Sequence, residues 1–207
     1  MHIENVVVSN FMTNCYLVGC EETKQAMVID PGGDFESIKQ MIDSSDYKVK
    51  LIVCTHGHND HILAVKKLKD YTGAKVYIQD RDKKCLQNSL YSGAMMFGFK
   101  QEECDEDKAL LDGDTFDVGN LHFTVLHTPG HTKGGMCLYT PGHLFSGDTL
   151  FYGTVGRTDF PRASFKEIQA SILEKLYKLP DDTIVYPGHG KRTTIGYEKK
   201  NNAYVRI

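Results

Sequence analysis

Four residues that can bind metal ions fall within the segment His56-Gly57-His58-Asn59-Asp60-His61. This segment follows Thr55 and the apolar run of residues 51–54, which is typical of a buried strand. Alternate side chains of an extended loop point to the same side, so His56 and His58 can bind one ion. Asp60 and His61 can then turn toward a second ion. Imidazole and carboxylate ligands suit zinc, iron or manganese rather than calcium or magnesium.

Three further candidate ligands lie farther along the chain, each on a glycine-containing turn after a predicted strand. They are His131 in T-P-G-H-T, Asp148 in S-G-D-T and His189 in Y-P-G-H. Glycine lets the backbone turn tightly and brings a ligand to the rim of a sheet. Function commonly lies on loops that a rigid sheet holds in place. None of the six cysteines is among the candidates, so a closed structural zinc site is not expected.

The elements that must position these residues are short strands with helices between them. Apolar or β-branched runs predict strands at residues 6–8, 15–19, 25–30, 51–54, 75–78, 115–118, 121–127, 136–139, 144–146 and 183–186. One helix is predicted after an N-cap at Asp34, one after the His/Asp segment, and one after a capping box at 164–167, with Phe165 turned inward. No repeat or linker divides the chain, so residues 1–207 are predicted to form one domain of sheets covered by helices.

The composition argues against several classes of protein. A net charge of −3 gives no electrostatic case for binding nucleic acid. No apolar run approaches the roughly 18 residues of a membrane-spanning helix, and the first residues lack the basic region of a signal peptide. The six cysteines are scattered, which indicates reduced thiols and a cytoplasmic location. The oligomeric state is left open.

The motifs T-H-x-H-x-D-H, T-P-G-H-T, G-D-T-L-F and Y-P-G-H, in this order, resemble the metallo-β-lactamase superfamily. Within it, the chain is similar to the glyoxalase II-like hydrolases over nearly its whole length. The resemblance implies an α/β fold, an αβ/βα four-layer sandwich of two mixed sheets flanked by helices, with metals at one edge. It also implies the ligand sets: His56, His58 and His131 for one ion, Asp60, His61 and His189 for a second, and Asp148 as a bridge.

Two divalent ions about 3.5–4 Å apart would lower the pKa of a bridging water toward about 7. Asp60 and Asp148 would orient the resulting hydroxide for attack on an acyl-thiol carbonyl. A thiolate leaving group needs little protonation, which agrees with the lack of an obvious general acid. We therefore predict a thioester hydrolase with two divalent transition-metal ions, zinc first and iron or manganese as alternatives, acting on a small-molecule thioester.

Arg157, in the segment G-R-T-D-F, is the predicted substrate-binding residue. A similar motif in glyoxalase II carries a lysine that binds the glutathione moiety, and an arginine could pair with a substrate carboxylate through two hydrogen bonds. The alternative is a structural pair between Arg157 and Asp159. Two features differ from glyoxalase II: only eighteen residues follow His189, with no separate C-terminal helical substrate domain, and Lys191 stands near where that family has a tyrosine.

A second hypothesis for the function is an oxidoreductase. Persulfide dioxygenases share this fold and also resemble the G-R-T-D-F segment. They use one iron, held by residues that match His56, His131 and Asp148. Two histidines and one carboxylate form the facial triad of oxygen-activating iron.

Overall fold

The computed structural model describes residues 1–207, and its backbone is built around two six-stranded mixed sheets. The first sheet has the spatial order β1 (His2–Val8), β2 (Thr13–Gly19), β3 (Gln25–Ile29), β4 (Lys48–Cys54), β5 (Lys75–Gln79) and β6 (Lys108–Leu110). Strands β1, β2 and β3 are antiparallel to one another in turn, and β3 to β6 run parallel. The carboxyl ends of these parallel strands therefore meet at one edge.

The second sheet has the spatial order β14 (Thr193–Thr194), β13 (Ile184–Pro187), β10 (His143–Gly147), β9 (Met136–Thr140), β8 (Leu121–His127) and β7 (Thr115–Val118). Only β10 and β13 are parallel, and Gly147 lies opposite Pro187 where the pair ends. A separate hairpin joins β11 (Leu150–Phe151) to β12 (Thr154–Val155).

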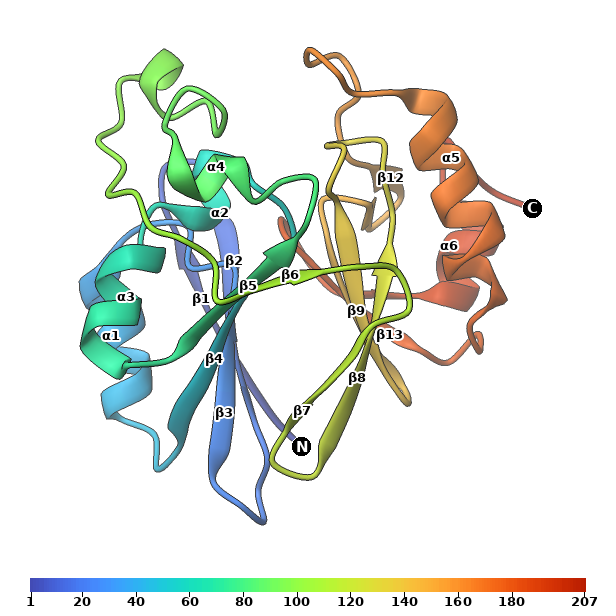
Figure 1. The fold of residues 1–207 in the computed structure, drawn as a ribbon. Helices are drawn as coiled ribbons and strands as arrows, with labels where there is room; N and C mark the ends of the chain where they lie inside the picture. The colour runs from blue at the N-terminus through green and yellow to red at the C-terminus, as the bar shows by residue number, and fades with distance from the viewer.

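Helices cover the outer face of each sheet. The helices are α1 (Phe35–Asp43), α2 (Asn59–Ile62), α3 (Val65–Thr72), α4 (Lys84–Gln87), α5 (Phe165–Glu174) and α6 (Ile195–Asn201). Two short 3-10 turns span Met95–Phe97 and Leu176–Lys178. Figure 1 shows α1 and α3 outside the first sheet, α5 and α6 outside the second, and the two sheets facing each other. The predicted αβ/βα four-layer sandwich is confirmed.

Three apolar clusters fill the three spaces between these layers. Strand β3 shows how the alternation of side chains along a strand serves two of them. Ala26 and Val28 pack into the cluster shared with α1 and α3, whereas Met27 and Ile29 pack into the cluster between the sheets. A strand buried on both faces needs an uninterrupted apolar run, and this is why the sequence alternation is weak there.

Several local predictions differ from the structure. Asp34 does stand before α1, but it makes no capping hydrogen bond and accepts one from the Ser9 N–H instead. The prediction that Phe165 faces inward is wrong: its exposed fraction is 42%, because it is the first residue of α5, and its ring makes an edge contact with Tyr204. The hairpin β11–β12, β14 and α6 carry little apolar periodicity and were not predicted. None of the helices is long and apolar enough to cross a membrane.

Candidate metal centre

The seven predicted ligands come from four separate segments that end at the same edge of the sandwich. His56 follows β4, His58 is the N-cap of α2, and α2 itself carries the next two candidates, Asp60 and His61. The remaining three lie beyond strands of the second sheet: His131 in the β8–β9 loop, Asp148 after β10 and His189 after β13. Because β10 and β13 are parallel neighbours, the last two leave the sheet at the same edge.

The structure brings all seven side chains together. The possible ligand atoms form three groups, and the atoms within each group all lie within 4.8 Å of one another. The groups are His56, His58 and His131; His56, His61 and Asp148; and Asp60, His61 and His189. Asp148 lies between the two histidine sets. Its Oδ1 is 3.4 Å from His61 Nε2, and its Oδ2 is 3.4 Å from both His131 Nε2 and His189 Nε2. This is the position from which one carboxylate could serve two ions.

Hydrogen bonds fix the orientation of the imidazole rings from outside the centre. Nδ1 of His61 donates to Asp30 Oδ2 at 3.0 Å, Nδ1 of His131 to the carbonyl of Arg157 at 2.8 Å, and Nδ1 of His189 to the carbonyl of Met12 at 3.3 Å. A neutral imidazole that donates through Nδ1 presents a lone pair at Nε2. These three Nε2 lone pairs all point into the centre, as metal ligation requires.

The unpaired atoms of the centre fit a cation. His61 Nε2 and His189 Nε2 are 3.2 Å apart, and in the neutral rings both are acceptors facing each other. His56 Nε2 and Asp148 Oδ1 are buried and have no hydrogen-bond partner. An unsatisfied buried polar atom is costly. Facing lone pairs and orphaned acceptors become favourable contacts when divalent ions lie among them.

Four histidines of the centre fall into two kinds, those whose pKa is lowered and those whose pKa is raised. Burial, followed by the neighbouring His131, lowers the pKa of His58 to about 4, and burial and His61 lower that of His56. Burial also opposes the charge on His61, but Asp148, Asp60 and Asp30 together raise its pKa to about 9. Despite burial, hydrogen bonds to Asp148 and Asp60 raise the pKa of His189 to about 11. Protons on these two rings balance the carboxylates when no metal does.

Asp30 is a positioning residue that the sequence reasoning missed. It is 1% exposed at the end of β3, and it accepts hydrogen bonds from the Thr55 N–H at 2.7 Å, the Thr55 hydroxyl at 2.6 Å and His61. Its backbone φ is +54°, a conformation uncommon for a residue with a side chain. The signal was present, since D-P-G-G is an acidic residue on a glycine turn after a strand, as at Asp148.

Asp82 is a second missed positioning residue. It is 5% exposed and accepts hydrogen bonds from the Gly57 N–H at 3.0 Å and the Gly134 N–H at 2.8 Å. It thereby ties the loop of the first cluster to the loop that follows His131. No spacing rule predicts this contact, because residue 82 lies in a polar stretch of turn and helix.

The close approach of the segments requires glycine at position 188. A Cβ on Gly188 would lie 2.3 Å from Asp148 Oδ1 and 2.7 Å from His61 Cε1. Such distances are far below ordinary contact, so a side chain there would displace two members of the centre. The glycine of Y-P-G-H is thus required by packing against the centre itself.

Arg157 lies at the rim of the centre. Its carbonyl accepts the His131 hydrogen bond, so the backbone of this loop is part of the site. Its side chain makes two hydrogen bonds with Asp159, of 3.0 and 2.8 Å, and stacks 4.4 Å above the Phe160 ring. Both partners of the ion pair are about two-thirds exposed, at 67% and 66%. The internal pair named as the alternative is therefore present, at the surface.

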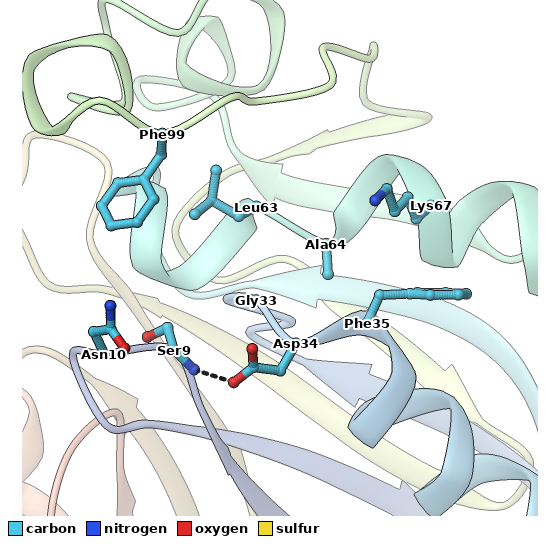
Figure 2. Close-up of a pocket in the computed structure, with 9 residues that line it drawn as sticks. All are labelled: Ser9, Asn10, Gly33, Asp34, Phe35, Leu63, Ala64, Lys67 and Phe99. Carbon is cyan, nitrogen blue, oxygen red and sulfur yellow. Dashed lines mark hydrogen bonds between the residues drawn. The ribbon is translucent and has the colours of Figure 1, made fainter.

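A cavity of about 250 Å³ lies beside α2, away from the seven donors. Its walls include Ser9, Asp34, Leu63, Lys67 and Phe99, and Figure 2 shows the hydrogen bond from the Ser9 N–H to Asp34 across its floor. None of the seven candidate ligands lines it. The donor cluster, rather than this cavity, is the candidate active site.

Comparisons with known proteins agree with this geometry. A family model described as the metallo-beta-lactamase superfamily matches residues 8–189. The hydroxyacylglutathione hydrolase GloC of Haemophilus influenzae is 38% identical, over 99% of this chain and 98% of that protein. Two solved structures are also similar. ETHE1 from Myxococcus xanthus has a TM-score of 0.85 at 32% identity, covering 99% of this chain and 84% of its own. TTHA1623 in a di-iron-bound form has a TM-score of 0.87 at 34% identity, covering 98% and 100%. The chain belongs to the metallo-β-lactamase superfamily.

Proposed function

We propose that this chain is a binuclear metal-dependent hydrolase that cleaves thioesters, as the glyoxalase II-like enzymes do. The observation that carries the proposal is the convergence of seven donors at one edge of the sandwich, with Asp148 between two histidine sets. Similarity over nearly the whole length to a protein named as a hydroxyacylglutathione hydrolase supports a thioester as substrate. The six free cysteines support a cytoplasmic location, and the net charge of −3 supports a small-molecule partner rather than nucleic acid.

The chain offers one donor set to each ion. His56, His58 and His131 would hold the first, Asp60, His61 and His189 the second, and Asp148 would contribute to both. Zinc is our first expectation, with iron or manganese as alternatives; a similar structure holds two irons. When bound, such ions polarise an acyl carbonyl and lower the pKa of a coordinated water toward about 7.

The two carboxylates have a role of their own in this proposal. The pKa of Asp60 is lowered despite its burial, chiefly by His61, and that of Asp148 is held well below its usual range in the same way. Both side chains therefore remain carboxylates that can accept a hydrogen bond from the attacking water and orient it. Neither is a protonated acid at neutral pH. A thiolate suits this centre as leaving group because it departs with little protonation.

Arg157 is proposed to bind a carboxylate of the substrate. The loop that carries it touches the centre through the hydrogen bond to His131. Its partner Asp159 is exposed, so a substrate carboxylate could take the place of Asp159 at the guanidinium. A purely structural Arg157–Asp159 pair is the competing interpretation.

Metal quantification on protein purified without chelator or added metal tests the proposal, with thioester hydrolysis assayed on the same preparation. We expect about two transition-metal ions per chain and hydrolysis of a glutathione thioester. The second candidate is a persulfide dioxygenase with one iron, which the G-R-T-D-F segment favours. Saturation at one iron, with oxygen uptake on a persulfide and no thioester hydrolysis, would replace the hydrolase by the dioxygenase.

A further inference from the structure

Lys191 is an exposed cation two residues after His189 that has no carboxylate partner. Its ammonium group lies 3.6 Å from the centroid of the Tyr152 ring. Arg157, at the other side of the centre, differs because Asp159 already neutralises it at 2.8 Å. Lys191 therefore keeps its positive charge available to an anion from solution, and the aromatic face holds the ammonium group in place.

Tyr152, which contacts this cation, is paired with a second tyrosine. Tyr152 and Tyr197 stack with ring centroids 4.9 Å apart, and the Tyr197 hydroxyl donates to the Tyr152 hydroxyl at 2.7 Å. Because Tyr152 accepts this bond, its own proton is free to be donated elsewhere. The hydrogen bond from Tyr197, and then the charge of Lys191, lower the pKa of Tyr152, which makes its hydroxyl a stronger donor. Both rings are partly exposed, at 40% and 38%.

The segments that carry these side chains are fixed by a buried carboxylate. Glu198 of α6 is 0% exposed and accepts hydrogen bonds from the Gly153 N–H at 3.0 and 3.1 Å and from the Thr193 hydroxyl at 2.6 Å. It accepts a further bond from the Asn202 amide at 2.8 Å. These bonds lock the β11–β12 turn to β14 and α6. These buried donors stabilise the carboxylate of Glu198, so it is not the partner of Lys191.

The backbone segment that carries Tyr152 borders the metal centre at its His189 end. The Phe151 ring, next to Tyr152, lies 6.1 Å from the His189 ring in an edge-on contact. Strand β11 begins two residues after Asp148. Arg157 borders the opposite end, through its carbonyl contact with His131. A substrate that crosses the centre would thus meet a different cation at each end.

We propose that Lys191, Tyr152 and Tyr197 form an anion-binding subsite, which holds a carboxylate or phosphate of the thioester at the His189 end of the centre. Lys191 donates a charge-assisted hydrogen bond and Tyr152 donates a second, while Tyr197 positions Tyr152. The subsite rests on the proposed thioester hydrolase function. It adds the requirement that the substrate be anionic at a point away from the scissile bond, so its loss should weaken binding and leave turnover unchanged.

The test compares three thioesters on the metal-loaded full chain. S-acetylglutathione carries carboxylates, acetyl-coenzyme A carries phosphates, and S-acetyl-N-acetylcysteamine is neutral. Lys191→Met should raise KM for one or both anionic thioesters by about fivefold, as expected for an exposed charged contact, with kcat within twofold. Tyr152→Phe should raise the same KM by about two- to threefold because one neutral hydrogen bond is lost. Lys200→Met, which removes an exposed lysine of α6, is the matched control and should change nothing.

Two outcomes would overturn the subsite. One is an unchanged KM for both anionic thioesters in Lys191→Met. The other is an equal rise for the neutral thioester, which would indicate a general disturbance of the centre. If the wild-type chain hydrolysed no thioester at all, the proposed function would fail. Calorimetric binding of glutathione and of coenzyme A would then test the subsite alone, and equal affinities for wild type and Lys191→Met would eliminate it.

Discussion

Asp30 Oδ2 and His61 Nδ1 lie 3.0 Å apart in a contact in which both side chains are almost completely buried. The same carboxylate holds the backbone of Thr55, which precedes His56. Asp30 therefore orients residues of both proposed ligand sets without entering either. Its carboxylate charge would also make His61 a more basic ligand for the proposed second ion.

Asp30→Asn should weaken binding of the second ion by about 10- to 100-fold, the usual effect of removing an outer partner of a histidine ligand. The amide keeps the shape but loses the charge. Competition titration with a chromophoric chelator measures the affinity. Asp34→Asn, four residues away and exposed on the same loop, is the control. Equal metal affinity in the two variants would contradict this role for Asp30.

Alanine variants of Asp148 and His189 should differ in the number of metal ions that each chain retains. A bridging carboxylate belongs to both sites, so Asp148→Ala should lose both ions. His189→Ala should retain about one ion, since His56, His58 and His131 remain intact. Elemental analysis of both purified variants, alongside wild type, measures the stoichiometry. Full metal content and full activity in His189→Ala would refute the two-metal assignment at that residue.

Metal binding should release protons from the second ligand set. The pKa of His61 is about 9 and that of His189 about 11, so both rings are protonated in the metal-free protein at pH 7.5. Ligation requires the neutral ring, so affinity for the second ion should rise with pH through about 9, where His61 loses its proton, and on toward about 11, where His189 does. The pKa of His58, about 4, means that this ligand adds little pH dependence above about 5.5. Calorimetry at pH 7.5 in buffers of different ionisation enthalpy counts the protons, and identical heats would contradict the assignment.

Asp82 should contribute to stability rather than to metal binding directly. Asp82→Ala leaves the buried N–H groups of Gly57 and Gly134 without acceptors. This should lower the free energy of unfolding by about 2–4 kcal/mol. Asp80→Ala removes only an exposed pair with Lys83 and should cost less than about 0.5 kcal/mol. Urea denaturation of the two variants measures the difference, and equal midpoints would show that Asp82 is dispensable.

Arg157→Ala should raise KM for an anionic thioester by about ten- to a hundredfold, with little change in kcat, if the guanidinium binds a substrate carboxylate. Asp159→Asn should lower KM because it frees the guanidinium from its internal partner. If the pair is only structural, both variants should lower the melting temperature and leave KM unchanged. Steady-state kinetics and melting curves on the same preparations separate the two interpretations.

Four of the predicted ligands, His56, His131, Asp148 and His189, were visible in the sequence because each follows a strand on or next to a glycine-containing turn. Asp148 and His189 share one edge of the second sheet because β10 and β13 are parallel neighbours. The contacts of Asp30 and Asp82 were not predicted, because a carboxylate that accepts distant backbone N–H groups leaves no periodic signal. Tyr152 and Tyr197 were missed for a related reason: they meet across 45 residues, in the turn of the β11–β12 hairpin and on a short helix, neither of which apolar patterns reveal.

The candidate metal centre joins residues that are far apart in the sequence and are therefore synthesised at different times. His58 and His131 are separated by 73 residues, and His61 and His189 by 128. The first sheet contributes β4 and α2, the second contributes the turns after β8, β10 and β13, and no ligand pocket exists until both sheets have closed on each other. We therefore expect metal uptake at this centre to follow synthesis of almost the whole chain. Once bound, the ions act as cross-links over long loops, so their removal should loosen the contact between the sheets and make the backbone amides at that edge exchange with solvent first.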